Sequence, residues 1–359
     1  MGNSAPYVKI PSQKGDSVLH GQLEKGFSFA FCLYRRPFRQ PLRTRYGLWS
    51  VREGILIRLT DLETGQQGYG EIAPLPWLGS ETLEQALAFC QQLPAELSEA
   101  QIEGIPATLP ATRFGLECAW LACRDPGWLA RDLSGLAFCG LLGKAVPVGS
   151  YPVYKGKVGV DAFEQEWKKL ASWLEQLPPG SRLRLDANGG LTLAEARRWL
   201  ALCDQLNQEW PGKIEFFEQP LPPEQHADLI QLSREFQTPL ALDESVAGLE
   251  QLQAVHRSGW QGILVVKPSL VGSGLALRDY LSQHPGLDLV FSSALETPIG
   301  AWHGLVWAGS LQAKTAHPRA LGWGVGEFFP EWDPVQLGAI SASERAALMQ
   351  AVWERHSRP

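Results

Sequence analysis

The sequence lacks three features that would place it in a specialised class of protein. It contains no apolar run of the ~18 residues that a membrane-spanning helix requires, and no basic-then-apolar signal pattern at its start. It also contains no arginine-rich run or basic stripe, and its formal net charge over 359 residues is −6. These absences give no reason to expect a membrane or a nucleic acid as partner. We therefore expect a soluble cytoplasmic protein.

Cysteine is scarce and carries no pairing signal. The six cysteines show no Cys-x-x-Cys spacing, and Cys118 and Cys123 lie within helix-like apolar text. We therefore expect all six to be reduced core residues and not disulfides or zinc ligands. What is present is ordinary for a globular protein, since 45% of the residues are apolar and 19% are charged. The length allows one large core and a smaller domain.

The first part of the chain predicts an α+β domain over residues 1–140. Residues 1–25 are polar and weakly patterned, so we expect weak order or a short hairpin there. Three strand-like segments follow, at 29–34, 54–59 and 68–71. Two helices are then predicted, one beginning near Ser80, where capping residues precede an apolar-periodic run, and one over Ala111–Cys123. Strands followed by helices, without alternation, are typical of this class.

From residue 141 to residue 323 the chain alternates between strands and helices. Eight segments are predicted as strands: 145–149, 153–158, 182–186, 214–218, 240–243, 262–267, 288–293 and, more weakly, 318–322. Alternation with near-continuous apolar strands favours a parallel sheet covered by helices, and about eight units favour a closed barrel. The predicted fold class is therefore α/β plus α+β, a modified (β/α)7β TIM-type barrel with an α+β capping domain. Residues 324–359 are expected to pack back on the capping domain.

The first barrel unit fits this pattern poorly. Between the predicted strands 145–149 and 153–158 there are too few residues for a crossover helix, which needs about a dozen. Either the first unit has lost its helix or the first strand is misplaced.

Ionisable residues end five of the predicted strands. The segments are Lys155-Gly156-Lys157, Asp186-Ala187-Asn188, Glu218-Gln219-Pro220, Asp243-Glu244-Ser245 and Lys267-Pro268-Ser269. Their key residues are about 24 to 32 residues apart, the length of one strand, one helix and two loops. Because parallel strands of a barrel end at one rim, we expect these side chains to meet in one pocket.

Three of these residues, Asp186, Glu218 and Asp243, are carboxylates that follow apolar strand text. Acidic residues are rarely buried unless they are paired or metal-bound, and converging carboxylates repel one another unless a cation neutralises them. Hard oxygen ligands fit Mg²⁺ best, with Mn²⁺ as a second choice. A single such acid is more often a helix cap or the partner of a lysine. Three at successive loops favour a metal site.

The lysines complete a reaction class. Lys155 and Lys157 lie two apart on one strand and point to the same face, so each is expected to lower the pKa of the other and favour a neutral amine base. Lys267 closes an apolar strand and approaches the pocket from another side. Together these groups predict that a metal binds a substrate carboxylate, an amine removes the proton from the adjacent carbon, and the resulting enediolate is stabilised.

This constellation resembles the enolase superfamily, in the muconate-lactonizing-enzyme subgroup with Lys-x-Lys on the second barrel strand and lysine on the sixth. The resemblance covers the barrel and much of the N-terminal domain. It implies Lys157 as the catalytic acid/base, Lys155 as its tuning partner and Lys267 as the lysine on the opposite face. It also matches the three carboxylates to the ligands of Mg²⁺. A histidine base in place of Lys267 would point to the mandelate racemase subgroup, and the sequence does not show one.

Two further segments are similar to the o-succinylbenzoate synthases of that subgroup. Residues 70–76 with 81–86 resemble their capping loop, and residues 292–300 resemble their segment after the seventh strand. The second segment offers two hydroxyls and backbone N–H groups at a helix start, which suits a substrate carboxylate; ordinary helix capping is the alternative. Arg45 is a candidate from a capping-domain loop, where arginines are usually solvated. The substrate-binding candidates are Ser292, Ser293, Glu296, Arg45 and Asn188.

The resemblance implies a dehydration in menaquinone or phylloquinone biosynthesis. Its substrate would be 2-succinyl-6-hydroxy-2,4-cyclohexadiene-1-carboxylate and its product 2-succinylbenzoate. An N-succinylamino acid racemase or a dipeptide epimerase is the alternative, although residues 320–327 lack the Asp-x-Asp in which dipeptide epimerases resemble one another. A muconate-type cycloisomerase is disfavoured by Ser292 and Ser293, and a non-catalytic binding barrel is the remote alternative. Whether the chain is a monomer or a homo-oligomer stays open.

Overall fold

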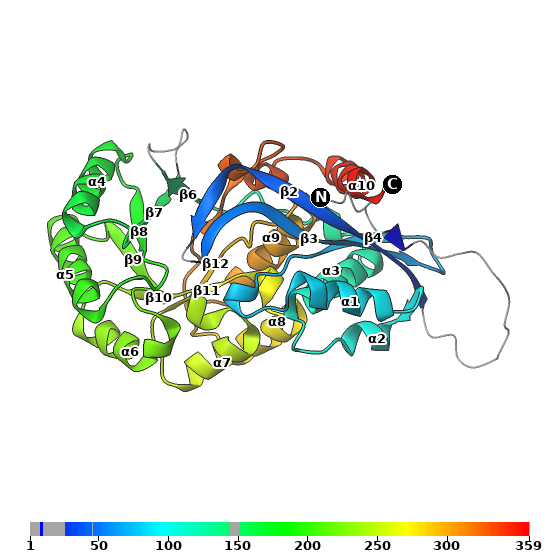
Figure 1. Cartoon of the computed structure of the whole chain (residues 1–359), viewed down its shortest axis with the longest axis horizontal. Helices are drawn as coiled ribbons and strands as arrows, with labels where there is room; N and C mark the ends of the chain where they lie inside the picture. Colours follow the sequence, from blue (N-terminus) through cyan, green and yellow to red (C-terminus); the bar gives the residue numbers. More distant parts are fainter. Residues whose placement is uncertain (1–7, 10–25, 45, 144–150, 359) are drawn as a thin grey trace.

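The computed structural model describes residues 8–9, 26–44, 46–143 and 151–358. It contains an eight-stranded parallel barrel beside a smaller antiparallel sheet, as Figure 1 shows. The predicted fold class is therefore confirmed. No helix in these ranges is long and apolar enough to cross a membrane. The expectation for residues 1–25 lies outside the described residues, apart from residues 8–9.

The capping domain is built on one long hairpin. Its strands are β1 (Val8–Lys9), β2 (Gly26–Thr44), β3 (Gly47–Asp61), β4 (Gln67–Ile72) and β5 (Glu96–Ser98), in the order β1-β2-β3-β4 with β5 also on β2. Its helices are α1 (Leu83–Gln92), α2 (Glu99–Glu103) and α3 (Pro110–Arg124). The helix predicted near Ser80 begins at Leu83, because the capping box is formed by Thr82 and Gln85. In Figure 1 the β2–β3 hairpin extends from the sheet toward the barrel.

Glycines allow α3 to lie directly on β4. A Cβ atom added at Gly70 would lie 2.0 Å from the carbonyl oxygen of Gly115, and one added at Gly68 would lie 2.0 Å from that of Ala119. Only glycine fits such a close approach of two backbones. The contact holds Glu71, the next residue of β4, in a fully buried position.

The barrel strands follow the predicted alternation. They are β6 (Phe138–Leu142), β7 (Val153–Lys157), β8 (Arg182–Asp186), β9 (Ile214–Glu218), β10 (Leu240–Leu242), β11 (Ile263–Val266), β12 (Leu289–Phe291) and β13 (Leu321–Gly324). The sheet order is β12-β11-β10-β9-β8-β7-β6-β13, and a bridge between Ser292 and Gly322 joins its two ends. Ile263 and Val265 pack inside the barrel, whereas Leu264 and Val266 face the helices, which explains why this strand is apolar throughout.

The sequence pattern predicted the first barrel strand at the wrong residues. The predicted strand 145–149 lies outside the described residues, and the position between β13 and β7 is taken by β6, at residues 138–142. The strand was missed because the Phe138–Leu142 text is short and carries two small residues, which weakens the apolar signal.

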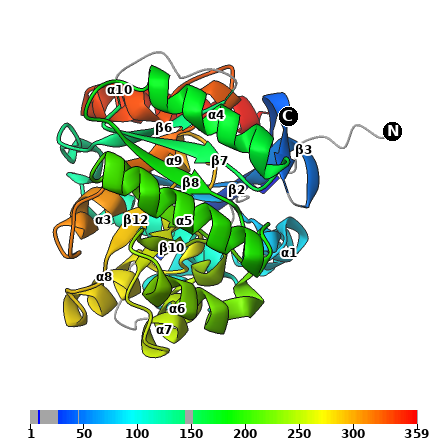
Figure 2. The same cartoon turned by 90° about the vertical axis from the view of Figure 1, so that its left-hand side faces the viewer.

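Helices cover the barrel on its outer side, and Figure 2 shows α4 to α7 around the strands. They are α4 (Phe163–Gln176), α5 (Leu193–Glu209), α6 (His226–Glu235), α7 (Leu249–Arg257), α8 (Gly274–Gln283) and α9 (Pro298–Gln312), with α10 (Ala342–Ser357) at the end of the chain. The predicted capping box of α5, Thr192 with Glu195, is present. All six cysteines are buried core residues, and none of them forms a disulfide bond.

The helix α10 packs against both parts of the molecule. The ring of His356 lies 6.0 Å from that of Tyr34 on β2, and the guanidinium of Arg345 lies 4.2 Å from the ring centre of Trp302 on α9. The C-terminal segment therefore bridges the capping sheet and the barrel.

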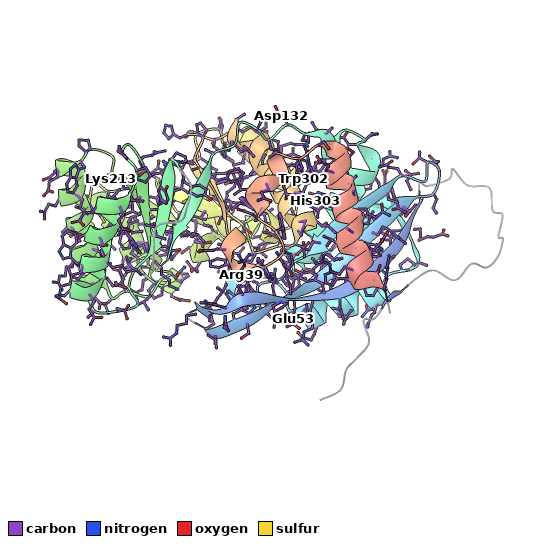
Figure 3. The ribbon with its side chains drawn as sticks, turned by 90° about the horizontal axis from the view of Figure 1, so that it is seen from above. Arg39, Glu53, Asp132, Lys213, Trp302 and His303 are labelled. Atoms are coloured by element: carbon purple, nitrogen blue, oxygen red, sulfur yellow. The ribbon has the colours of Figure 1, made fainter. Side chains whose placement is uncertain are left out.

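A buried histidine also joins the two parts. His303 on α9 is 1% exposed and lies beside Trp302 (Figure 3). Trp128 Nε1 donates to His303 Nδ1 at 2.8 Å, which leaves Nε2 to donate to the carbonyl oxygen of Tyr69 at 2.8 Å. Burial lowers the pKa of His303 to about 4, although the hydrogen bond to Tyr69 opposes this. The folded protein therefore holds this imidazole neutral.

We expect the interdomain contact of His303 to weaken in acid. Below pH 6.5 the unfolded chain binds a proton at this imidazole and the folded protein does not, so the free energy of unfolding should fall by up to about 3 kcal/mol between pH 6.5 and about 4. Urea unfolding of wild type and of His303→Gln at several pH values measures the difference. His317→Gln, at an exposed position, is the control and should keep the wild-type pH profile. An identical profile in all three proteins would contradict the assignment.

Candidate active site

The predicted ionisable residues lie together at the C-terminal ends of five consecutive strands. In the sheet register Lys157 pairs with Asp186, and Asp186 pairs with Glu218. Asp243 directly follows β10 and Lys267 directly follows β11. Because inward-facing positions alternate along each strand, these side chains share one end of the barrel interior.

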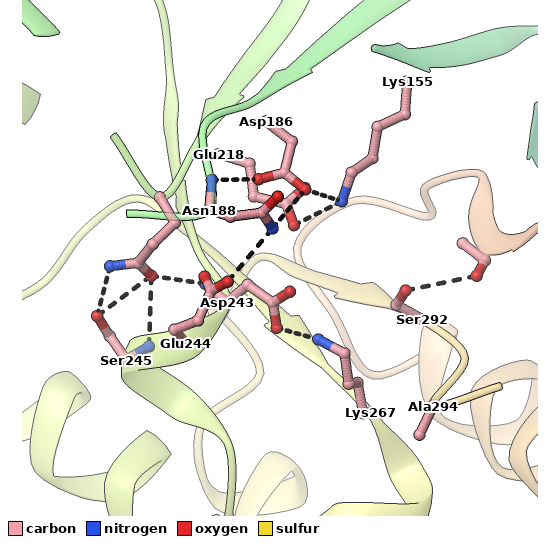
Figure 4. Close-up of polar contacts among 12 residues, drawn as sticks. Lys155, Asp186, Asn188, Glu218, Asp243, Glu244, Ser245, Lys267, Ser292 and Ala294 are labelled. Atoms are coloured by element: carbon pink, nitrogen blue, oxygen red, sulfur yellow. Dashed lines mark hydrogen bonds and ion pairs between the residues drawn. The ribbon is translucent and has the colours of Figure 1, made fainter. Parts of the chain in front are cut away.

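Two lysines hold the three carboxylates, as Figure 4 shows. Lys155 Nζ lies 2.7 Å from Asp186 Oδ2 and 2.7 Å from Glu218 Oε1. Lys267 Nζ forms an ion pair with Asp243 Oδ1 on the other side of the cluster. All three carboxylates are buried, at 5%, 1% and 8% exposure for Asp186, Glu218 and Asp243.

The charge of Lys155 is set by these acids and not by Lys157. Burial lowers the pKa of Lys155, but the negative charges of Asp186, Glu218 and Asp243 outweigh it and raise that pKa well above its ordinary value. The expectation that Lys157 lowers the pKa of Lys155 is therefore wrong for this arrangement of charges. Lys157 itself is half-buried at the end of β7, and within the described residues its ammonium group makes no hydrogen bond or ion pair.

Two glutamates of the site have raised pKa values. Burial, followed by the charge of Asp186, raises the pKa of Glu218 to about 8. Burial, followed by the charge of Asp243, raises the pKa of Glu244 to about 7. Even with two lysines in the cluster, burial and the neighbouring acids therefore disfavour the charged form of both glutamates.

The donor set suits a divalent cation. Three buried carboxylates on neighbouring strands supply hard oxygen ligands and excess negative charge, which is what Mg²⁺ binds in proteins. Among the residues that the structure describes, however, no three His, Cys, Asp or Glu side chains are already oriented to hold a metal ion together. The acids instead form ion pairs with Lys155 and Lys267.

Two further residues of the site, Gln219 and Glu244, belong to the five segments singled out in the sequence, but the sequence pattern suggested no role for them. The side chain of Gln219 is fully buried, and its Oε1 accepts from the backbone N–H groups of Asp243 at 3.0 Å and Ser245 at 3.3 Å. Glu244 Oε1 accepts from Asn188 Nδ2 at 3.3 Å, and its Oε2 is buried without a hydrogen-bond partner among the residues that the structure describes. The signal for both was their position directly after a candidate ligand.

Backbone strain gathers at the same rim. Among the described residues, the positive-φ residues other than glycine are Asn188 at 44°, Gln219 at 37° and Leu295 at 64°. Each follows a barrel strand by one to four positions. Such conformations persist only where the surroundings enforce them, and they cluster at functional sites. Asn188 also donates to Asp186 Oδ2 at 3.2 Å, so it orients that carboxylate.

The remaining substrate-binding candidates differ in burial and in their hydrogen-bond partners. Ser292 is half-buried and its hydroxyl lies 3.4 Å from the carbonyl oxygen of Gly322. Ser293 Oγ donates to Glu296 Oε2 at 2.6 Å, and Glu296 is 2% exposed. Ser293 and Glu296 are therefore bonded to each other. Arg45 lies outside the described residues.

At the start of α9, where a substrate carboxylate was expected to bind, the backbone N–H groups bond to a carboxylate of the protein itself. Glu71 Oε2 accepts from the backbone N–H groups of Thr297 at 3.0 Å and Gly300 at 2.9 Å. These N–H groups are the ones that a bound anion would use. The protein's own carboxylate therefore fills that position, since β4 of the capping domain packs against α9.

A large apolar cavity lies elsewhere. It has a volume of about 1190 Å³ and is lined by residues such as Trp167, Leu174, Trp210 and Lys213. Lys213 directly precedes β9, at the far end of the barrel in Figure 3. This cavity is therefore at the opposite end of the strands from the lysines and acids, and it has no part in their chemistry.

Comparison with known proteins agrees with this architecture. Residues 143–327 match the family model described as "Enolase C-terminal domain-like", and residues 29–123 match the model described as "MenC, N-terminal domain". The chain is 43% identical over 340 residues to the o-succinylbenzoate synthase of Thermosynechococcus vestitus, covering 90% of this chain and 97% of that protein. It is 30% identical to that of Edwardsiella ictaluri, covering 74% of this chain and 81% of that protein.

Solved structures extend the comparison. The crystal structure of o-succinylbenzoate synthase from Thermosynechococcus elongatus, complexed with Mg in the active site, superposes with a TM-score of 0.78 at 37% identity, covering 91% of this chain and 99% of that one. A dipeptide epimerase from Methylococcus capsulatus has the same fold, with a TM-score of 0.70 at 21% identity, covering 86% of this chain and 93% of that one.

A capped barrel with acids and lysines at one rim defines the class of enolase-like enzymes. Within that class, the identity and coverage above are decisive, because they extend over both domains. The chain belongs to the o-succinylbenzoate synthase family.

Proposed function

We propose that this chain catalyses the dehydration of 2-succinyl-6-hydroxy-2,4-cyclohexadiene-1-carboxylate to 2-succinylbenzoate, as a lyase of menaquinone or phylloquinone biosynthesis. The observation that carries the proposal is the meeting of amine groups and three carboxylates at one end of the barrel, with Lys155 Nζ 2.7 Å from each of two acids. Membership of the family supports it.

The three acids Asp186, Glu218 and Asp243 would hold Mg²⁺, and Mn²⁺ in its place is a compatible hard cation. The bound cation would stabilise the negative charge that develops on the substrate carboxylate. Asn188 and Gln219 orient these ligands through their bonds to Asp186 and to the Asp243 backbone.

The lysines supply the proton chemistry. Lys157 takes the proton from the carbon next to the substrate carboxylate, and it returns that proton to the departing hydroxyl, so that one C–H and one C–O bond break and water leaves. Lys267 faces the developing negative charge from the other side of the site. Lys155, paired with Asp186 and Glu218, keeps a positive charge beside Lys157.

Aromatisation of the ring makes this elimination strongly favourable, so the site has only to lower the barrier to removal of the proton.

The rival epimerase reaction within the subgroup requires the site to recognise the ammonium group of a dipeptide. The eighth strand here, β13, reads Leu-Gly-Trp-Gly, and its Trp323 is fully buried. It therefore offers no acid for the ammonium group of a dipeptide.

Supplying the cyclohexadiene acid with Mg²⁺ and following aromatic product by absorbance tests the function directly. We expect product formation that EDTA stops. A parallel assay measures racemisation of N-succinylamino acids by loss of optical activity. Racemisation without any aromatic product would replace the proposed dehydration by the racemase function.

A further inference from the structure

Glu71 is a buried carboxylate of the capping domain that bonds to a helix of the barrel. Its side chain is 1% exposed. It accepts from the backbone N–H groups of Thr297 and Gly300 at the start of α9, and from the hydroxyl of Thr297. Tyr34 OH on β2 donates to its Oε1 at 2.6 Å. Four donor groups from two domains therefore converge on one carboxylate, which fixes its position more firmly than a single cap would.

The surroundings are built around this contact. A Cβ atom added at Gly300 would lie 2.7 Å from Glu71 Oε2, so only glycine leaves room for the carboxylate. Glu71 follows the close approach of β4 and α3 at Gly70. Neither the carboxylate nor the helix start can move without the other.

The helix start that Glu71 holds directly follows the loop from Ser292 to Glu296, which leads from β12 to α9. A second capping-domain residue holds the same loop, because Arg36 Nη1 donates to the carbonyl oxygen of Glu296 at 3.0 Å. Arg36 is itself fixed by Glu331, at 3.1 Å, and by the ring of Phe329, 3.3 Å from its guanidinium carbon. On the barrel side, Ser269 Oγ donates to Glu296 Oε1 at 2.7 Å. The loop is thus held between the two domains.

We propose that Glu71 is a positioning residue, which sets the Ser292–Glu296 loop from the capping domain and so couples domain placement to substrate binding. The proposal rests on the proposed function for its kinetic part. The chemistry itself stays with the lysines of β7 and the end of β11, which Glu71 does not contact. Loss of the Glu71 contact should therefore weaken substrate binding more than it slows the reaction.

The chain offers a matched control in Glu81. This glutamate is 3% exposed and accepts from the backbone N–H groups of Ala111 at 3.1 Å and Thr112 at 2.6 Å, at the start of α3. It has the same chemistry and burial as Glu71, but both partners belong to the capping domain. A purely structural role predicts equal effects from Glu71→Gln and Glu81→Gln.

The test compares Glu71→Gln, Glu81→Gln and wild type in the full-length protein. In Glu71→Gln we expect KM to rise about tenfold with kcat within about twofold, and amide hydrogen exchange over residues 292–300 to rise about tenfold. In Glu81→Gln we expect a lower Tm with wild-type KM and wild-type exchange in that loop. Tyr34→Phe, which removes one donor to Glu71, should give a smaller shift in the same direction and stands in if Glu71→Gln does not fold.

The proposal is overturned if the variants of Glu71 and Tyr34 leave both KM and loop exchange at the values of Glu81→Gln, or if kcat falls while loop exchange stays unchanged. A wild-type protein that does not turn over the cyclohexadiene acid would refute the proposed function alone. In that case, exchange in the loop still decides whether Glu71 sets its position.

Discussion

Replacing Lys157 with alanine is expected to lower kcat by about 10² to 10⁴-fold, the usual contribution of a general acid–base group, while Tm stays unchanged. The side chain lies at the end of β7, at the register position of Asp186, and within the described residues it has no bonded partner to lose. Its removal therefore subtracts the base and little else. Steady-state turnover of the cyclohexadiene acid and a thermal melt measure the two effects.

Lys168→Ala is the control for this experiment, because Lys168 is exposed on α4. It should behave as wild type. Undiminished turnover by Lys157→Ala would defeat the assignment of Lys157 as the base. If Lys157→Ala instead exchanged the α-proton of an N-succinylamino acid on one face only, Lys267 would be acting as a second base and the racemase function would gain support.

Loss of the cation site is expected to have an effect of similar size. Asp186→Asn should lower kcat/KM by more than about 10²-fold, because charge on the substrate carboxylate is then less well stabilised. EDTA should stop wild-type turnover, and added Mg²⁺ should restore it. Mg²⁺ should also raise Tm of wild type, since it binds the folded state only, and should raise that of Asp186→Asn much less.

Glu224→Gln serves as the acid control, because Glu224 lies in the segment after β9, close in the chain to Glu218 at the end of that strand, but is exposed. Its turnover and its response to Mg²⁺ should match those of wild type. Full activity of the chelated protein, or an equal Mg²⁺-dependent rise in Tm for Asp186→Asn and wild type, would remove these acids from the mechanism.

Local patterns in the sequence carried much of the fold. The capping box at Thr192 and Glu195 starts α5 where predicted, because side chain and backbone partners lie within four residues of one another. The apolar run of β11 correctly predicted a strand that is buried on both faces. The short β6 was missed, because its position depends on pairing with β7 and with β13, which both come later in the chain, β13 after six further strands.

For the candidate site, the sequence likewise predicted the positions of the residues but not their electrostatics. Spacing alone brought Asp186, Glu218, Asp243 and Lys267 to one rim, because each strand–helix unit returns the chain to that rim. The electrostatics could not be read from spacing. The pKa of Lys155 is raised because three acids surround it in space, although another lysine, Lys157, lies two residues along the same strand.

The sequence by itself determined the barrel, the residues at its rim and the reaction class, because strand periodicity and the length of each unit are local properties. Only the tertiary structure decided which charged side chains pair with each other and which group bonds to the N–H groups at the start of α9. Glu71 and Thr297 are 226 residues apart in the chain, and no periodicity links them. Their contact exists because β4 of one domain packs on α9 of the other, where a buried carboxylate needs hydrogen-bond donors and the N–H groups of that helix start supply two of them.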